Sequence, residues 1–169
     1  FGAMALGEGQ GKRWREGRFH GPYLREPMMD RGIGVDTLET AASWSKIDAL
    51  RTAVRAALDT AMRETAPRPG AQGIVMSHIS HSYPDAASLY FTFIFQRTLD
   101  GEVEQWPTRK RAASDAIIAN GGPISHHHGV GQDHLPWIAK EKSELGIEIL
   151  RAIKHTLDPN DILNAGKLI

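Results

Sequence analysis

Leu89-Tyr90-Phe91-Thr92-Phe93-Ile94-Phe95-Gln96 decides the fold of this chain, because its apolar side chains alternate in the way that a β-strand requires. Successive side chains of a strand point to opposite faces of its sheet. One face of this strand carries Leu89, Phe91, Phe93 and Phe95. Such a stripe must be covered by helices to leave water, so Tyr90 faces the other side, where a ligand or partner domain would lie.

The neighbouring segments supply the other predicted elements. Alternating side chains and turn residues predict strands over residues 33–40, 74–82 and 89–96. A short segment after the glycine pair predicts a fourth strand over residues 123–126. Apolar residues at helical spacing predict helices over residues 45–65, 102–120 and 134–156. A capping-box-like signal at Ser45 to Asp48 marks the first helix start.

This order of elements predicts an α+β fold. Strand, helix, strand, strand, helix, strand (βαββαβ) is the ferredoxin-like arrangement, an antiparallel sheet with helices on one face, here with an additional C-terminal helix. Residues 1–13 are rich in glycine and are expected to be irregular. Pro22 and Pro27 are expected to bend or break any helix over residues 14–31.

Composition narrows the function classes. The 169 residues suffice for one domain, and their formal net charge is zero, which argues against a general nucleic-acid binder. Cysteine is absent, so disulfides and thiolate metal sites are excluded. The N-terminal Phe1-Gly2-Ala3-Met4 has no signal-peptide pattern. We therefore expect a fragment of an intracellular protein, cytoplasmic, or peroxisomal if the source is eukaryotic.

The strongest local signal for chemistry is a run of histidines between glycines. Residues 120–131 contain His126, His127 and His128 in succession. A pair of glycines precedes them, and two glycines separated by one residue follow them. Imidazoles titrate near neutral pH and suit proton transfer, anion binding or metal ligation. The glycines let the backbone approach a flat ligand closely. The plainer alternative is a polar surface loop that happens to contain histidines.

Tyr90 and the pair of His78 and His81 are two further candidate site features. Tyr90, on the face opposite the phenylalanines, could donate a hydrogen bond or act as an acid or base, or could be an ordinary half-buried strand tyrosine. His78 and His81 are three residues apart, so a regular strand points them to opposite faces. Both could join one site only if the strand contains a bulge.

The residues around the histidines resemble a known family. Gly121-Gly122-Pro123-Ile124-Ser125-His126-His127-His128-Gly129-Val130-Gly131 is similar to a motif of the alkyldihydroxyacetonephosphate synthases, in the vanillyl-alcohol-oxidase group of flavoproteins. The resemblance extends over nearly the whole chain. Further similar segments are Phe1-Gly2, Gly7-Glu8, Tyr23-Leu24-Arg25-Glu26, Glu39-Thr40-Ala41-Ala42-Ser43-Trp44, the Tyr83 and Tyr90 pair, and residues 157–162.

The resemblance implies a reaction and a set of residues. The family replaces the acyl chain of acyl-dihydroxyacetone phosphate with a fatty alcohol, without net redox change, using noncovalently bound FAD. It implies that Tyr90 and His126, His127 and His128 are catalytic and that Arg25 binds substrate. It also implies cofactor contacts for His128 and Asn164. The chain, residues 1–169, would then be the C-terminal substrate or cap domain of an FAD-linked oxidase-type enzyme.

The resemblance also implies partners. FAD would be held mainly by an N-terminal FAD-binding domain that this chain lacks, and the substrate would be a lipid-like small molecule; a homodimer remains open. Related 2-hydroxy-acid dehydrogenases hold a metal at positions that fall on His78, Tyr90 and His127. Two of these positions have changed, so no metal is expected here. The alternatives are an FAD-dependent D-lactate or glycolate dehydrogenase, or a noncatalytic ferredoxin-like module.

Overall fold

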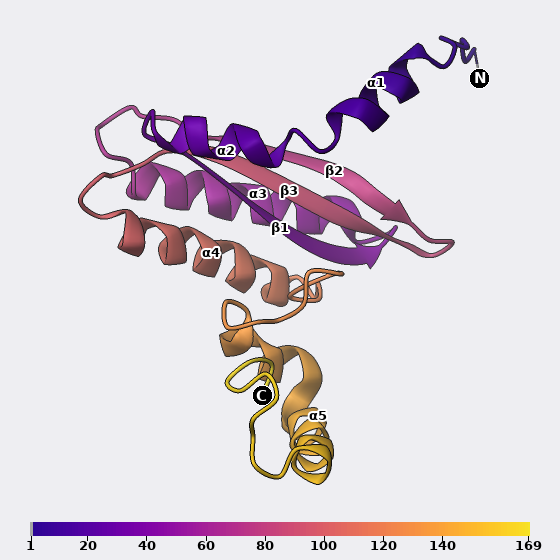
Figure 1. Ribbon diagram of the computed structural model, residues 1–169, viewed down its shortest axis with the longest axis vertical. Coiled ribbons are helices and arrows are strands. Elements are labelled where there is room, and N and C mark those ends of the chain that lie inside the picture. Colours follow the sequence, from indigo (N-terminus) through magenta and orange to yellow (C-terminus); the bar gives the residue numbers. More distant parts are fainter. Residues whose placement is uncertain (1) are drawn as a thin grey trace.

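The computed structural model describes residues 2–169, except the side chains of Pro22 and Glu102, so Phe1 of the family-like segment lies outside the described residues. Figure 1 shows a sheet with helices beside it and a C-terminal helix below. In chain order the elements are α1 (Gly9–Gly17), α2 (Pro22–Met29), β1 (Ile33–Ser43), α3 (Ile47–Glu64), β2 (Ile74–Ser82), β3 (Ala86–Gln96), α4 (Glu102–Ala119) and α5 (Leu135–Leu157).

The sheet is antiparallel and has β3 at its centre, in the order β1-β3-β2. Phe91 of β3 pairs with Leu38 of β1 and with Ser77 of β2, which fixes the register on both sides. The phenylalanine face is buried as predicted, with Phe91 and Phe93 fully inaccessible to water. The same core contains Leu38, Leu50, Val54, Leu58, Met62, Val75, Leu89, Phe91, Phe93, Phe95, Ala113 and Ile117.

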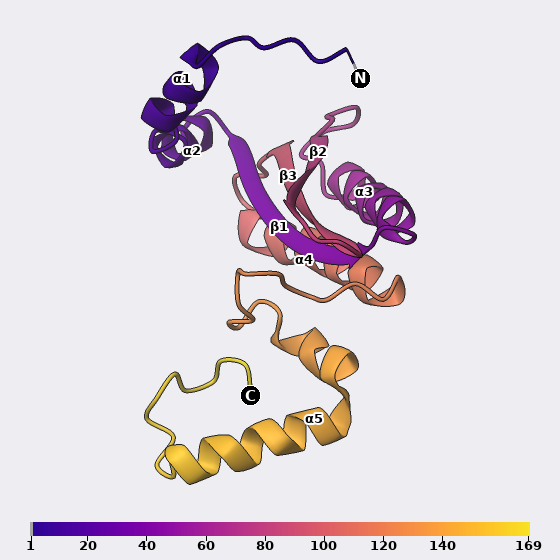
Figure 2. The same cartoon turned by 90° about the vertical axis from the view of Figure 1, so that its right-hand side faces the viewer.

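Helices α3 and α4 cover this core face, which confirms the predicted layering. Figure 2 shows α3 on one side of the sheet and α2 on the other, where α2 lies near the start of β1. Helix α3 begins at Ile47 after Lys46 and has no side-chain cap. The capping box expected at Ser45 is wrong, because the Ser45 hydroxyl lies 3.2 Å from the Ser43 hydroxyl instead.

The fourth strand of the predicted βαββαβ order does not form within the described residues. Residues 123–126 lie beside β1, but among the described residues they form no backbone-to-backbone hydrogen bond with it. Pro123 has no N–H to donate, and its carbonyl accepts a hydrogen bond of 2.8 Å from the Thr40 hydroxyl. The Ile124 N–H donates to the Glu141 carboxylate at 2.6 Å. The α+β class and the antiparallel sheet are confirmed, and this edge of the sheet is left to a loop.

Both ends of the chain extend away from the sheet. Residues 9–13, expected to be irregular, belong to α1, because Lys12, Arg13 and Arg15 favour helix despite the glycines. Helix α5 confirms the predicted C-terminal helix, and its apolar stripe is largely exposed, with Leu145 66% and Leu157 75% accessible. Within residues 2–169 no helix is both long and apolar enough to cross a membrane.

Candidate active site

A group of polar side chains lies on the face of the sheet opposite the phenylalanines, which we call the open face. Glu39 of β1 pairs in register with Tyr90 of β3, and Tyr90 pairs with His78 of β2. Paired residues of neighbouring strands point to the same face. The three side chains therefore form a row across the sheet, and the prediction that Tyr90 faces away from the phenylalanines is confirmed.

A bulge in β2 adds His81 to this row. The register shifts between Ile79, which pairs with Leu89, and Ser82, which pairs with Ala87, so β2 contains one extra residue there. The His81 N–H donates to the Ser88 hydroxyl at 3.0 Å, and its Nδ1 lies 3.5 Å from Glu39 Oε1. The bulge that the sequence analysis required for His78 and His81 to share a face is present.

The loop after α4 carries the three consecutive histidines to the same face. The His128 N–H donates to the His126 carbonyl at 2.8 Å, and His127 between them has a φ of 63°. This is a γ-turn with its central residue in the left-handed region, a strained conformation for a residue with a Cβ. The turn splays successive side chains, so His126 and His128 both reach Glu39.

Glu39 is the centre of the cluster. It is 3% exposed, and its ion-pair partners within the described residues are imidazoles, with His126 Nδ1 and His128 Nε2 each 3.5 Å from a carboxylate oxygen. The Ser80 hydroxyl donates to Glu39 Oε1 and lies 2.6 Å from the Ser88 hydroxyl. Burial opposes ionisation, but hydrogen bonds from Ser80 and Ser88 and the charge of His126 outweigh it, so the pKa of Glu39 lies below its ordinary value.

Aromatic contacts fix the remaining rings. Tyr90 stacks on His78, with 5.2 Å between ring centroids, and meets the edge of His128 at 5.5 Å. Its hydroxyl makes no hydrogen bond in the part of the chain that the structure describes. The Tyr83 hydroxyl lies 3.0 Å from His126 Nε2, and the His127 ring stacks on His81 at 4.5 Å. A free phenol and several imidazoles around an ionised carboxylate can take up, hold and deliver protons.

Two predicted site residues lie apart from this cluster. Arg25 is on α2 and lines a pocket with Met29, Val35 and Trp106. Val35 precedes Glu39 by four residues of strand, which is about 13 Å. Asn164 lies in the tail after α5, where it is exposed and has a φ of 51°. The tail returns toward the loop that contains His126 to His128, because the Leu168 N–H donates to the Gly131 carbonyl at 3.5 Å.

Glu39, Ser80 and Ser88 are site residues that the sequence pattern alone did not predict. Glu39 appeared only as one member of an alternating strand and of a family-like segment. Its importance follows from the register with Tyr90 and from the loop that closes over it, and both are long-range features. A carboxylate on a strand whose neighbours are apolar, threonine or alanine was the one local signal.

Comparisons with known proteins show the family to which the chain belongs. The family model described as FAD linked oxidases, C-terminal domain, matches residues 3–168. The chain belongs to this family. It is 35% identical over 99% of its length to alkyldihydroxyacetonephosphate synthase of Dictyostelium discoideum, and 30% identical over 100% of its length to the protein of that name from Trypanosoma brucei brucei. It spans 27% of each of these relatives, about a quarter of their length.

A solved structure of alkyldihydroxyacetonephosphate synthase shares the fold of this chain. The TM-score is 0.63 at 27% sequence identity, over 97% of this chain and 25% of that one. The family member's fold therefore supports the arrangement of β1, β2 and β3 with their covering helices.

Proposed function

We propose that this chain is the C-terminal, substrate-covering part of an FAD-dependent enzyme that exchanges the acyl chain of acyl-dihydroxyacetone phosphate for a fatty alcohol. The observation that carries the proposal is the convergence of Tyr90 and the three histidines around the ionised Glu39 on the open face. The similarity to alkyldihydroxyacetonephosphate synthases over the whole chain supports it. The FAD-binding domain of the same protein would cover this face.

The open face suits a flat cofactor ring but offers no place for the cofactor's phosphates. Tyr90 is only partly buried and keeps a free hydroxyl, and the neighbouring Ile74 and Met76 are 59% and 46% exposed. An exposed, partly apolar surface of this kind typically contacts a ligand or partner. Phosphates need an anion-binding loop at a helix N-terminus. Neither the glycine-rich residues 7–11 nor residues 120–131 resemble such a loop. FAD bound by the partner domain would supply the electrophile that retains the dihydroxyacetone phosphate unit during the exchange.

The residues of this chain would move the protons. Removal of a proton from the carbon beside the ketone needs a base that works near neutral pH, which an imidazole or an activated tyrosinate provides. Glu39 would orient His126 and His128 and stabilise their protonated forms. Arg25 would bind an anionic group, the phosphate or the departing carboxylate, at the other end of the open face. A substrate with a long chain can span that separation.

The test is turnover of the full-length protein that contains this chain. Tyr90→Phe should reduce turnover by about two to four orders of magnitude, the range for loss of a general acid or base, with an unchanged melting temperature. His127→Ala should also reduce turnover, and His155→Ala, an exposed histidine on α5, is the matched control. Near-normal turnover in both Tyr90→Phe and His127→Ala would rule the proposal out.

A second measurement separates this function from a 2-hydroxy-acid dehydrogenase. Acyl exchange causes no net reduction, so the substrate pair should turn over without an external electron acceptor. Acceptor-dependent oxidation of D-lactate or glycolate would favour the dehydrogenase instead. The chain of residues 1–169 alone should bind no stoichiometric FAD, and a yellow preparation with one flavin per chain would contradict the proposed division of labour between domains.

A further inference from the structure

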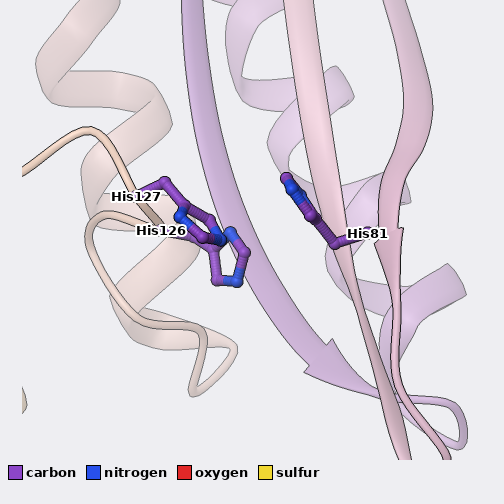
Figure 3. Close-up of side chains that lie close together, drawn as sticks. All are labelled: His81, His126 and His127. Carbon is purple, nitrogen blue, oxygen red and sulfur yellow. The ribbon is translucent and has the colours of Figure 1, made fainter.

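We propose that His81, His126 and His127, together with Glu39, form a binding site for a first-row transition metal ion, of which Zn²⁺ fits best. One ring nitrogen from each histidine lies within 4.8 Å of the other two. Figure 3 shows the rings of His126 and His127, from the loop after α4, directed across β1 toward His81 of β2. Zn²⁺ sites in proteins commonly combine imidazoles with a carboxylate.

The charge of Glu39 is the first independent reason to expect a cation. The carboxylate is 3% exposed, and its ion-pair partners within residues 2–169 are histidines alone. A buried charge is costly unless it is paired or coordinates a metal. Oε1 of Glu39 lies 3.5 Å from both His81 Nδ1 and His126 Nδ1, so a cation among these atoms would neutralise the carboxylate.

The state of His126 is the second reason. Its Nδ1 is buried and makes no hydrogen bond within the described residues, whereas its Nε2 lies 3.0 Å from the Tyr83 hydroxyl. Metal-binding imidazoles usually have one nitrogen on the metal, while the N–H of the other donates a hydrogen bond to a neighbouring group. Ser80 and Ser88 fix the carboxylate in the same way. The outer contacts of a metal site are thus already present.

The three rings need only a small movement to bind one ion. Zn–N bonds of about 2.0–2.1 Å in a tetrahedral site bring ligand nitrogens to about 3.4 Å from one another. His81 and His127 are exposed, so their rings can rotate inward from the present stacked arrangement. Imidazole and carboxylate donors without a thiolate favour Zn²⁺, Co²⁺, Ni²⁺ or Cu²⁺ over Mg²⁺ or Ca²⁺.

This site differs from the set of metal-binding positions that the related dehydrogenases suggest. That set was His78, Tyr90 and His127, and it shares only His127 with the present one. Two of the proposed ligands, His126 and His127, also belong to the proton-transfer residues. A metal ion on them would prevent proton transfer, so Zn²⁺ should inhibit turnover reversibly; this one consequence rests on the proposed function.

The experiment is a titration of the metal-free protein with Co²⁺ and Zn²⁺. We expect one Co²⁺ per chain with the visible absorption of tetrahedral coordination, displaced by Zn²⁺. His81→Ala and Glu39→Gln should weaken Co²⁺ affinity at least tenfold, and His155→Ala should leave it unchanged. Binding that is equally tight in wild type and His81→Ala, or absent from wild type, would overturn the site.

A single variant keeps this proposal separate from the proposed enzyme activity. Tyr90 is not a ligand in the proposed set, so Tyr90→Phe should bind Co²⁺ as the wild type does. If Tyr90→Phe binds Co²⁺ and both Tyr90→Phe and His127→Ala turn over normally, the proposed function fails and the metal site stands. If turnover falls and neither protein binds Co²⁺, the metal site fails and the proposed function stands.

Discussion

The two faces of the sheet use the same three strands for different purposes. On the core face of β3, Leu89, Phe91 and Phe93 are almost inaccessible to water and pack under α3 and α4. On the open face, Ser88 and Tyr90 alternate with them and meet an ionised carboxylate and imidazoles. Successive residues of β3 therefore alternate between the hydrophobic core and the candidate site.

The core face stabilises the fold, whereas the open face carries the residues of the candidate site. Core-face side chains gain free energy by leaving water, about 25 cal/mol per Å² of apolar area. The open face contains a buried carboxylate, a left-handed histidine and exposed apolar side chains, each unfavourable for an isolated domain. Substitutions on the two faces should therefore have opposite signatures: lost stability on one, and lost function with kept or gained stability on the other.

The largest effect on stability is expected from Phe91→Ala. Phe91 is fully buried at the centre of the core, and truncation of such a side chain to alanine destabilises a domain by about 3–5 kcal/mol. Its neighbour on the open face, Thr92→Ala, is the control, with an expected loss of about 1 kcal/mol or less. Urea denaturation of both variants checks the pair. Equal losses for Phe91→Ala and Thr92→Ala would remove the distinction between the faces.

A smaller loss is expected when a glycine of the core face is filled. Gly34 pairs with Phe95, and a Cβ built on Gly34 would lie 2.2 Å from the Phe95 ring. Overpacking of this kind destabilises by about 1–3 kcal/mol. Gly11→Ala in α1 meets nothing within 4 Å and should be neutral or slightly stabilising. Thermal denaturation distinguishes them, and a stable Gly34→Ala protein would show that β1 and the Phe95 ring can separate at little cost.

Local patterns were sufficient to predict most of the fold. Residues 74–82 form β2 as predicted, and the alternation of residues 89–96 gave the core face, because side-chain period and burial are both local properties of a strand. The fourth strand failed for a reason that also lies in the sequence, since Pro123 cannot donate to a ladder. The Ile124 partner, Glu141, is 17 residues away and could not be assigned from spacing.

The candidate site was predictable in its parts and not in its assembly. Tyr90 and the histidines carry a recognisable motif, and the structure brings them to one face. Glu39, which they surround, is 87 residues before His126 in the chain, and only the register of β1 on β3 places it there. Arg25 is the opposite case. It belongs to a family-like segment of the sequence, but the structure places it at the other end of the sheet from Glu39.

The smallest expected effect, and the most informative about the open face, is a gain in stability from His127→Gly. His127 has a φ of 63°, and the left-handed region costs a residue with a Cβ about 1–2 kcal/mol. Glycine avoids this cost but loses more conformational entropy on folding, and the stacking on His81 disappears, so the expected net gain is about 0.5–1 kcal/mol. His128→Gly is the matched control, because His128 is not among the residues with positive φ and should lose about 0.5–1 kcal/mol. Melting temperatures of the two variants should therefore move in opposite directions. A His127→Gly protein less stable than His128→Gly would mean that the turn is held by contacts of the imidazole itself, and that the histidine is structural. A more stable protein would mean that the strain is kept in place for what His127 does on the open face.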